Sequence, residues 1–469
     1  MSVVDDIESK IAGDVLTAPE DVSRYLTDWR GIWTGKAIGV ARPQTREDVA
    51  AIVRCCRANQ VAIVPQGGNT GLSGGATPDK VGNSLVVSLE KIDRIRNIDL
   101  SANVIEVEAG LTLAAVQEKA AHHGRIFPLS LAAEGTCQIG GVLSTNAGGT
   151  HVFRYGSARH LCVGIEVVLP SGEMWQATKA LFKDNTGYAI RDLFVGAEGT
   201  LGIITAASLR LFPQPKGAVA ALLGIDSLAT GCELYAQARG YFGPELTACE
   251  FMTAGCIERV VRHVNGARNP FDAAYPEYLL MEISSWENEE RARERTLGWL
   301  DALFDEGLIR NAVMSENNAQ FDRLWQLREG ISESQSAKNP VIKHDISVPL
   351  SKISEFDQRC KERFSKHFAN VEIQAFGHLG DGNLHYNVIP VIGSDHTEFL
   401  NRQNEINMLV HDLVDSFGGS ISAEHGLGVL RRDEAARYKT AEELEVLHAI
   451  KRAIDPIGLM NPGKVLGTD

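Results

Sequence analysis

Cysteine is scarce in this sequence, with 8 residues among 469, and none of them forms a CxxC pair. This usage excludes a disulfide scaffold or an iron–sulfur cluster and predicts reduced thiols. No apolar run approaches the roughly 20 residues of a membrane-spanning helix. The acidic N-terminus, residues 1–15, lacks the basic and apolar segments of a secretory signal. We therefore expect a cytoplasmic protein, with peripheral association at a membrane left open.

Acidic residues outnumber basic residues: the chain has 60 Asp and Glu and 46 Lys and Arg, which gives a net charge of −14. This balance argues against nucleic acid as the main partner. With 44% apolar and 23% charged residues the chain has an ordinary globular composition, and its length suits about three domains. The sequence contains no internal repeat and no low-complexity segment. Composition thus excludes fibrous and disordered classes but selects no function.

The pattern along the chain predicts four parts. Residues 1–34 predict a peripheral helical segment, and residues 35–214 show short strands, glycine turns and few helices. After the Pro-rich linker 213–217, residues 215–425 mix strands with long charged helices, and residues 426–469 read as helical. Strict strand–helix alternation is too rare for a doubly wound parallel sheet, so we expect an α+β fold.

A glycine-rich segment, residues 65–76, directly follows a predicted strand. Its sequence is PQGGNTGLSGGA, in which glycines expose successive backbone N–H groups and the hydroxyls of Thr70 and Ser73 add donors. Such a nest suits a pyrophosphate. It is not the GxGxxG of a nicotinamide-binding unit. Taken alone, a turn without a ligand is an equal alternative.

Two further glycine-rich segments, residues 135–149 and 196–203, also adjoin predicted strands. Small residues at three separate places indicate backbone that lies close against one long ligand. An extended dinucleotide explains all three segments together.

Polar residues gather in two motifs of the second half. The segment 376–387, FGHLGDGNLHYN, places His378 and His385 on either side of a glycine-rich turn, and Glu424 and His425 are adjacent in SAEHGLG. Paired flanking strands would let the two imidazoles converge. Two His and one Glu form a common set for zinc, and Mn or Fe also accept it. With 13 His in the chain, structural or surface roles stay open as the alternative.

A third group comprises Arg328 and Ser332, one helical turn apart, and Lys343 before a predicted strand. Two cations and a hydroxyl suit a carboxylate, which arginine binds in bidentate fashion. The alternative is a solvated helix face, which is where such residues usually lie.

The three glycine-rich segments, in this order, resemble the FAD-binding domain of the vanillyl-alcohol-oxidase or para-cresol-methylhydroxylase (PCMH) type over roughly residues 35–214. The resemblance implies two α+β subdomains with FAD extended between them and its pyrophosphate at the first segment. Since that segment lacks the His to which some members attach FAD, we expect non-covalent FAD. The residues expected to bind FAD are Pro65, Gln66, Gly67, Gly68, Asn69, Thr70, Gly71, Ser73, Gly74, Gly135, Thr136, Gly140, Gly141, Ser144, Asn146, Gly148, Gly149, Glu198, Gly199, Gly202, Ile203 and Asn461.

The motifs GHLGDGNLH, AEHGLG and MNPGKV resemble the covering domain of FAD-linked D-2-hydroxyacid dehydrogenases, so that the match extends over nearly the whole chain. The likeness is greatest to members that act on D-2-hydroxyglutarate, with D-lactate dehydrogenases and glycolate oxidase flavin subunits as relatives. It implies an α+β substrate-binding cap domain and a helical C-terminal segment that returns to the FAD domain. The family's roles carry over as follows: a divalent metal, commonly zinc, at His378, His385 and Glu424; substrate at Arg328, Ser332, Lys343 and Asn387; and the base at His425.

The implied activity is oxidation of a D-2-hydroxy acid, foremost D-2-hydroxyglutarate, to the 2-oxo acid. The substrate chelates the metal, His425 takes the hydroxyl proton, and the C2 hydrogen leaves as hydride to flavin N5. A second substrate carboxylate explains both Arg328 and Lys343. Ser332 stands where the family usually has Thr, which keeps the hydroxyl and removes a methyl group. The family passes its electrons to an electron-transfer flavoprotein or to quinone, and its dimers suggest a homodimer.

Other interpretations stay open at this point. D-Lactate, D-malate or glycolate could be the substrate, and the chain could be a non-catalytic FAD subunit of a larger complex. An oxidase that uses O₂ on a phenol or sugar alcohol is disfavoured, because such substrates carry no carboxylate for Arg328 and Lys343. A zinc hydrolase with accidental glycine-rich loops would contain no flavin.

Overall fold

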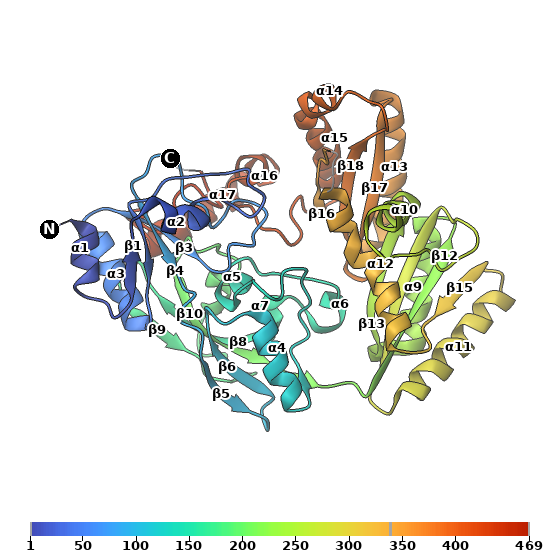
Figure 1. Cartoon of the computed structure of the whole chain (residues 1–469), viewed down its shortest axis with the longest axis horizontal. Helices are drawn as coiled ribbons and strands as arrows, with labels where there is room; N and C mark the ends of the chain where they lie inside the picture. Colours follow the sequence, from blue (N-terminus) through green and yellow to red (C-terminus); the bar gives the residue numbers. More distant parts are fainter. Residues whose placement is uncertain (1, 337–339, 468–469) are drawn as a thin grey trace. The chain divides into compact units, whose positions relative to one another are not determined.

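The computed structural model describes residues 2–336 and 340–467. The chain forms two compact units, labelled by element in Figure 1. Unit 1 comprises Met1–Gly149, Tyr155–Gln214 and Glu424–Asp469, and unit 2 comprises Thr150–Arg154 and Pro215–Ala423. Within the described ranges, no helix is both long enough and apolar enough to cross a membrane.

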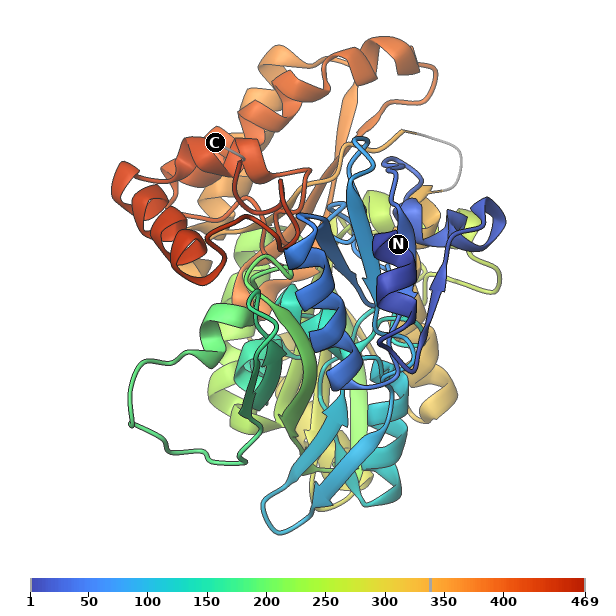
Figure 2. The ribbon, with the colours of Figure 1, turned by 90° about the vertical axis from the view of Figure 1, so that its left-hand side faces the viewer.

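The first sheet of unit 1 has four strands in the order β1-β2-β4-β3. The strands are β1 (Asp14–Leu16), β2 (Gly39–Arg42), β3 (Ala62–Gln66) and β4 (Ser84–Ser88), and the helices beside them are α1 (Val3–Glu8), α2 (Pro19–Leu26) and α3 (Arg46–Ala58). Strands β2 and β3 both pair with β4 in parallel, so α3 is the crossover between them. Figure 2 shows α1 and α3 side by side. The C-terminal segment joins this sheet, because Asn461 donates its N–H to the Ile63 carbonyl of β3 at 2.7 Å.

The second sheet of unit 1 has five antiparallel strands in the order β5-β6-β10-β8-β9. They are β5 (Ile95–Asp99), β6 (Val104–Glu108), β8 (Cys162–Val168), β9 (Met174–Ala177) and β10 (Ile203–Arg210), and a small ribbon pairs β7 (Arg125–Ile126) with β11 (Phe212–Pro213). The other helices of unit 1 are α4 (Leu113–His122), α5 (Ile139–Ser144), α7 (Ala158–Leu161), α8 (Arg191–Phe194), α16 (Arg432–Tyr438) and α17 (Ala441–Ile454), whereas α6 (Val152–Tyr155) belongs to unit 2 except for its last residue.

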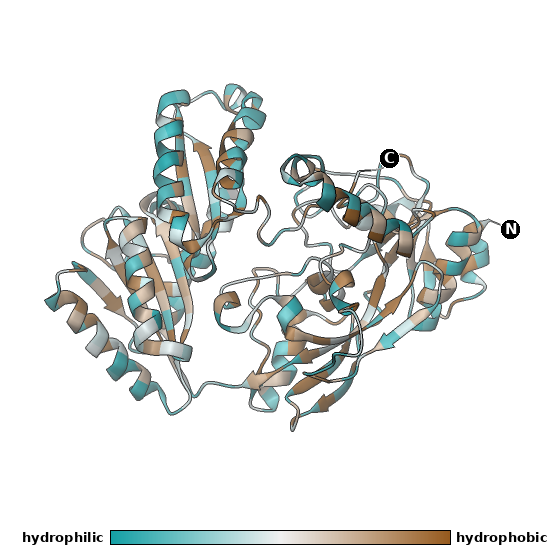
Figure 3. Ribbon diagram, turned by 180° about the vertical axis from the view of Figure 1, so that it is seen from behind, coloured by the Kyte–Doolittle hydropathy of each residue, from teal (hydrophilic) through white to brown (hydrophobic). Residues whose placement is uncertain are grey.

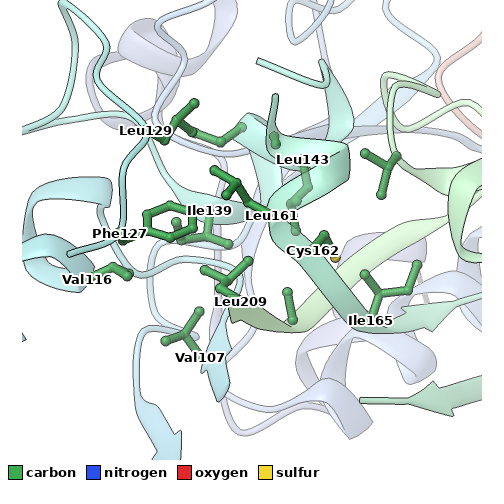
Figure 4. Close-up of a cluster of buried hydrophobic side chains, with 14 of the residues drawn as sticks. Val107, Val116, Phe127, Leu129, Ile139, Leu143, Leu161, Cys162, Ile165 and Leu209 are labelled. Carbon is green, nitrogen blue, oxygen red and sulfur yellow. The ribbon is translucent and has the colours of Figure 1, made fainter. Parts of the chain in front are cut away.

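Successive side chains of a strand point to opposite faces of the sheet, and this alternation determines which residues form the core of unit 1. On one face of the second sheet, alternate residues such as Ile105, Val107, Ile165 and Leu209 pack against α4, α5 and α7, as Figure 4 shows. The opposite face carries carboxylates such as Glu108 and Glu166 together with the apolar Val168 and Ile203, which pack in a second cluster with residues of α3. Apolar burial on the first face, at roughly 25 cal/mol per Å², therefore holds α4, α5 and α7 in place, and α5 is itself part of the second glycine-rich segment.

Unit 2 is built on a seven-stranded antiparallel sheet in the order β15-β12-β14-β13-β17-β18-β16. Its strands are β12 (Gly217–Ile225), β13 (Leu246–Thr253), β14 (Glu277–Ser285), β15 (Asn311–Met314), β16 (Asp345–Ser347), β17 (Val371–His378) and β18 (Asn383–Pro390). In Figure 3 these strands are largely brown, whereas the helices carry much of the teal. The sheet is thus the apolar layer of the unit.

Helices cover both faces of this sheet. The α-helices of the unit are α9 (Leu228–Phe242), α10 (Ala254–His263), α11 (Glu289–Asp305), α12 (Asn318–Ser336), α13 (Ile353–His367), α14 (His396–Asn401) and α15 (Gln403–Ser416), and the 3-10 turns are η1 (Gly243–Glu245), η2 (Leu350–Lys352) and η3 (Leu379–Asp381). The face that carries Leu222, Met252 and Phe376 packs against α10 and α12. The α10/α12 face is the one that also carries the charged residues described below.

The α+β class expected from the sequence is confirmed. One local prediction was wrong. The N-terminal segment is not purely helical, because residues 14–16 form β1 and pair with β2. Arg402 separates α14 from α15, and its guanidinium donates to the His367 carbonyl at 3.1 Å and lies over the Phe368 ring.

Candidate active site

The three glycine-rich segments of unit 1 lie against one another. A Cβ atom added at Gly68 would meet the Thr136 carbonyl oxygen at 2.0 Å, and one added at Gly199 would meet the Pro65 ring at 3.0 Å. Side chains at these positions would push the segments apart. Glycine therefore allows the first segment to contact both of the others, as one shared ligand requires.

Open space and orphaned polar atoms between these segments fit a polar ligand. A Cβ atom at Gly135 or Gly141 would meet nothing within 4 Å. Among the residues that the structure describes, the buried Gln138 Oε1 and Asn461 Oδ1 have no hydrogen-bond partner. A buried polar atom left in this state costs about 1–3 kcal/mol. The segments present therefore fit FAD, whose hydroxyl and amide groups can satisfy such acceptors.

Several of the side chains predicted to bind FAD are engaged in holding these segments. Their internal hydrogen bonds are Gln66 Nε2 to the Tyr25 and Ala76 carbonyls, Asn69 Nδ2 to the Thr27 carbonyl, Thr136 Oγ1 to the Ala133 carbonyl, Ser144 Oγ to the Gly140 carbonyl, and Asn146 Oδ1 from Ser157 Oγ and the Arg159 N–H. Ile203 is buried in the core of β10. These side chains therefore hold the loops in shape. Contacts to a ligand would come from the backbone of these residues and from their polar atoms that are not used in the internal hydrogen bonds.

Glu198 connects the third glycine-rich segment to the residues that follow His425. Its buried carboxylate accepts the Leu427 N–H at 2.7 Å and the Gly428 N–H at 2.9 Å. Burial raises the pKa of Glu198 above its ordinary value, although the two N–H groups act in the opposite direction. Ser73 Oγ donates to the His425 carbonyl at 3.2 Å. The segment with the predicted base is therefore held by two of the predicted cofactor segments.

In unit 2, the hairpin of β17, η3 and β18 brings His378 and His385 together, on neighbouring strands in Figure 1. Their ring centroids lie 5.8 Å apart, with the rings nearly perpendicular. Gly377 has φ +152° and Gly382 has φ +79°, and a Cβ atom at Gly377 would meet the Asn383 carbonyl oxygen at 2.4 Å. The glycines of the motif therefore permit the tight turn that pairs the two imidazoles.

A carboxylate on the neighbouring strand β13 engages this hairpin. Glu250 is 0% exposed, its Oε1 lies 2.8 Å from His378 Nδ1, and its Oε2 accepts the Arg328 Nε–H at 2.7 Å. Burial by itself raises the pKa of Glu250, but the charges and hydrogen bonds of His378 and Arg328 outweigh it and lower the pKa to about 2. Glu250 is therefore an anion that holds two of the predicted site residues.

Arg328 lies on α12 with only 7% of its surface exposed, and its guanidinium stands 4.9 Å from the centroid of the Phe376 ring. Within the described part of the chain, no hydrogen bond from its Nη1 or Nη2 to another residue is present. A buried guanidinium with two terminal nitrogens available suits a carboxylate. Ser332 follows one turn later and is exposed, and Lys343 is half-buried.

Asn387, a predicted substrate contact, is buried and bonded within unit 2. Its Oδ1 accepts the His344 N–H at 3.2 Å, and its Nδ2 donates to Gln335 Oε1 at 2.7 Å. One amide hydrogen is left for a further acceptor. Asn387 thus serves the structure of the sheet edge before any substrate binds.

Asp345 lies on β16, beside His385 of β18. Its Oδ1 lies 3.9 Å from His385 Nδ1 and accepts Asn383 Nδ2 at 3.0 Å. Its carbonyl oxygen accepts the Ala423 N–H, and Glu424 follows Ala423 directly in the chain. Two imidazoles near carboxylates make a donor set that fits a divalent metal such as zinc.

Glu250 and Asp345 belong to none of the sequence motifs that predict the site. Glu250 is the one charged residue in the otherwise apolar or small strand LTACEFMT, and Asp345 follows a cation and a histidine in KHDISV. An isolated carboxylate inside a buried strand must find a partner. The single charge in this apolar strand therefore indicates that Glu250 has a partner, but it does not indicate which residue the partner is.

Two family models match this chain. Residues 37–178 match an FAD binding domain, and residues 214–465 match the family described as FAD linked oxidases, C-terminal domain. The chain belongs to the family of FAD-linked oxidases, as its motifs suggested, and is an FAD-dependent oxidoreductase.

Among its relatives are proteins named D-2-hydroxyglutarate dehydrogenase. The one from Xanthomonas citri pv. viticola is 36% identical over 452 residues, which cover 96% of this chain and 94% of the relative. The mitochondrial one from Bos taurus is 36% identical over 98% of this chain and 83% of the relative. A D-2-hydroxyglutarate–pyruvate transhydrogenase of Saccharomyces cerevisiae is 32% identical over 96% of this chain and 90% of the relative.

Solved structures share the fold at low identity. p-Cresol methylhydroxylase has a TM-score of 0.73 at 16% identity over 99% of this chain and 96% of that one. Alkyldihydroxyacetonephosphate synthase has a TM-score of 0.71 at 16% identity over 98% of this chain and 84% of that one. The PCMH-type fold expected from the sequence is confirmed.

Proposed function

We propose that this protein oxidises D-2-hydroxyglutarate to the 2-oxo acid with FAD as electron acceptor. The observation that carries the proposal is the buried Arg328, whose terminal nitrogens have no hydrogen-bond partner among the described residues and whose Glu250 partner also holds His378. A cation beside an imidazole pair suits an anionic substrate with a nearby metal. The names of relatives that match nearly the whole chain support this substrate class.

In this proposal the substrate carboxylates are bound by Arg328 and Lys343. Arg328 presents two parallel N–H donors, and Lys343 adds a compact charge two residues before β16 begins at Asp345. The Ser332 hydroxyl and the remaining Asn387 amide hydrogen are further donors for substrate oxygens. A dicarboxylate uses both cations, whereas D-lactate uses one.

The metal ligands we propose are His378, His385 and Glu424. The hydrogen bond of His378 Nδ1 with Glu250 favours the tautomer in which Nε2 carries the lone pair. A metal held by these three residues would supply Lewis-acid polarisation of the substrate hydroxyl, and FAD held by the glycine-rich segments would supply a two-electron acceptor for the C2 hydrogen. His425 takes the hydroxyl proton.

We further propose that FAD is bound non-covalently. The first glycine-rich segment has no His or Cys, and Cys137 of the second segment packs in the hydrophobic core of unit 1. Acid precipitation should therefore release all flavin into the supernatant.

The two electrons leave reduced FAD for an external acceptor. An electron-transfer flavoprotein or quinone is the acceptor that the sequence motifs suggested. The name of the Saccharomyces cerevisiae relative adds a second candidate, a 2-oxo acid such as pyruvate, which would be reduced to its 2-hydroxy acid. We also propose that the protein forms a homodimer. Its proposed location is the cytoplasm or the periphery of a membrane.

Anaerobic flavin bleaching tests the function. The FAD-loaded protein is mixed with D- and L-2-hydroxyglutarate, D-lactate, D-malate and glycolate, before and after treatment with a chelator. We expect bleaching by D-2-hydroxyglutarate, none by the L-form, and loss of bleaching after chelation that added Zn²⁺ restores. Bleaching by D-lactate alone would contradict the dicarboxylate substrate, and no bleaching by any acid would contradict the enzyme.

A further inference from the structure

Glu250 occupies an unusual place for a carboxylate. It lies at the centre of β13, on the sheet face that packs against α10 and α12, where its neighbours include Leu280, Met252 and Phe376. An ionised carboxylate in such surroundings costs several kcal/mol unless charged or hydrogen-bonding partners compensate it. Both of its oxygens have such partners.

Each carboxylate oxygen of Glu250 contacts a residue of a different proposed site, one the metal site and the other the substrate carboxylate site. Oε1 lies 2.8 Å from Nδ1 of His378, a proposed metal ligand, and Oε2 lies 2.7 Å from Nε of Arg328, the proposed carboxylate donor. His378 ends β17 and Arg328 lies in the middle of α12. Glu250 is thus the group through which a residue of the sheet and a residue of the helix share one hydrogen-bond network.

We propose that Glu250 is a positioning residue that couples the metal site to the substrate carboxylate site by fixing His378 and Arg328 relative to each other. The inference rests on the proposed function and deepens it.

The effect on His378 follows from its two ring nitrogens. A carboxylate that accepts Nδ1–H fixes the tautomer and the ring orientation and raises the basicity of Nε2. Glutamine has almost the same shape, but its amide nitrogen cannot accept a hydrogen bond. Glu250→Gln therefore loses the acceptor either for His378 or for Arg328.

The effect on Arg328 follows from its planar fork. Glu250 engages Nε and the Phe376 ring lies against the guanidinium, so that the plane of the guanidinium is fixed while Nη1 and Nη2 extend beyond the contact. Pre-set donors lose less side-chain entropy when a carboxylate binds. Without Glu250, the guanidinium would also be a buried charge with no counter-charge at this position.

Glu282 supplies a matched control on the same sheet face. It lies on β14 opposite Ala248, two residues from Glu250 in register, and its Oε1 accepts the Thr247 hydroxyl at 2.7 Å and lies 3.5 Å from His151 Nε2. The hydrogen bonds of Glu250 to His378 and Arg328 do not involve Glu282. Glu282→Gln thus removes a second, half-buried carboxylate from the same sheet face and keeps the two contacts of Glu250.

The experiment compares wild type, Glu250→Gln and Glu282→Gln as full-length, FAD-loaded proteins. Zn²⁺ affinity is measured by competition with a chromophoric chelator, and KM and kcat are measured with D-2-hydroxyglutarate. We expect Glu250→Gln to weaken Zn²⁺ binding about 10- to 100-fold and to raise KM by a similar factor, with FAD content unchanged. Glu282→Gln should retain the Zn²⁺ affinity and KM of the wild type, whatever its thermal stability.

Three outcomes separate the possibilities. If Glu250→Gln binds Zn²⁺ and substrate like the wild type, or if both variants lose them equally, the positioning role is overturned. A wild type that neither binds Zn²⁺ nor reduces its flavin contradicts the proposed function and overturns the inference with it. Should Glu250→Gln fail to fold, Glu250→Asp, which keeps the charge and reaches only one partner, must weaken either Zn²⁺ binding or substrate binding for the inference to stand.

Discussion

The Arg328 guanidinium is held on three sides, by its helix, by Glu250 at Nε and by the Phe376 ring. Burial makes each remaining N–H donor worth more than it would be on the surface, because water does not compete for it. At the scale of single residues, the candidate site therefore consists of buried charges, each with a defined partner.

Arg328→Lys should raise KM for D-2-hydroxyglutarate about 30- to 100-fold, equivalent to about 2–3 kcal/mol, with a smaller change in kcat. Lysine keeps the charge but cannot form two parallel N–H bonds to a carboxylate while it also bonds Glu250. Steady-state kinetics measure the change. The control is Arg323→Lys on the exposed side of the same helix, which should be neutral. An unchanged KM in Arg328→Lys would remove Arg328 from the substrate site.

The sequence identified most charged candidates at this scale but not their partners. His378 and His385 can be recognised in the sequence because they lie in a glycine-rich motif. Arg328 is recognised through the resemblance of the chain to a known family. Glu250 was missed since its partners lie 78 and 128 residues away in the chain. No local pattern records a contact of that separation.

Among the elements, the β17–β18 hairpin was predictable and the N-terminal segment was not. The hairpin has two strands with β-favouring residues on either side of a glycine turn, so its structure can be predicted from the local sequence. Strand β1 has three residues, Asp14–Leu16, and exists because β2 supplies its hydrogen bonds. A strand that short has no period of its own to detect.

The glycine pair at the start of α5 offers a test of the cofactor segments. A Cβ atom at Gly140 would meet Ala109 Cβ at 2.9 Å, whereas one at Gly141 would meet nothing within 4 Å. Gly141→Ala should therefore leave the apoprotein as stable as the wild type, or more stable by about 0.5–1 kcal/mol, and should weaken FAD binding. Flavin fluorescence titration and thermal unfolding measure the two effects.

Gly140→Ala is the comparison variant, and it should destabilise the apoprotein by about 1–3 kcal/mol because Ala109 cannot move freely in the core. If Gly141→Ala binds FAD as tightly as the wild type, the open space beside Gly141 is not part of the cofactor site.

At the scale of the whole molecule, buried ion pairs connect layers of structure in addition to apolar packing, which in unit 1 brings Val168 and Ile203 of the second sheet against α3 and the first sheet. In unit 1, Glu166 on β8 of the second sheet bonds Arg96 Nη2 at 3.0 Å and also bonds Arg46, the first residue of α3 beside the first sheet. Burial by itself raises the pKa of Glu166, but hydrogen bonds from Arg96, Arg46 and Thr205 lower it below 4.5. The ionised carboxylate is therefore the stabilising form.

Glu166→Gln should lower the free energy of unfolding by about 2 kcal/mol at pH 7, somewhat less than the loss of one partner from a fully buried pair. Because the folded pKa is depressed, the advantage of the wild type is fully present above the unfolded value of about 4.5 and is lost as pH falls through the folded pKa. Denaturant unfolding at pH 7, 5 and 3 measures the difference. A difference that stays constant over this range would show that the carboxylate charge is not its source.

The sequence by itself determined the α+β class, the three glycine-rich segments that we predict to bind FAD, the histidine hairpin and the family, because each of these depends on residues that are close in the chain. Tertiary structure alone decided how three glycine-rich segments contact one another, and that Glu250 joins His378 to Arg328. These contacts depend on strand order and register in each unit, which arise from the packing of whole sheets and helices. The physical reason is that burial and charge pairing act through space, whereas sequence patterns report only periodicity along the chain.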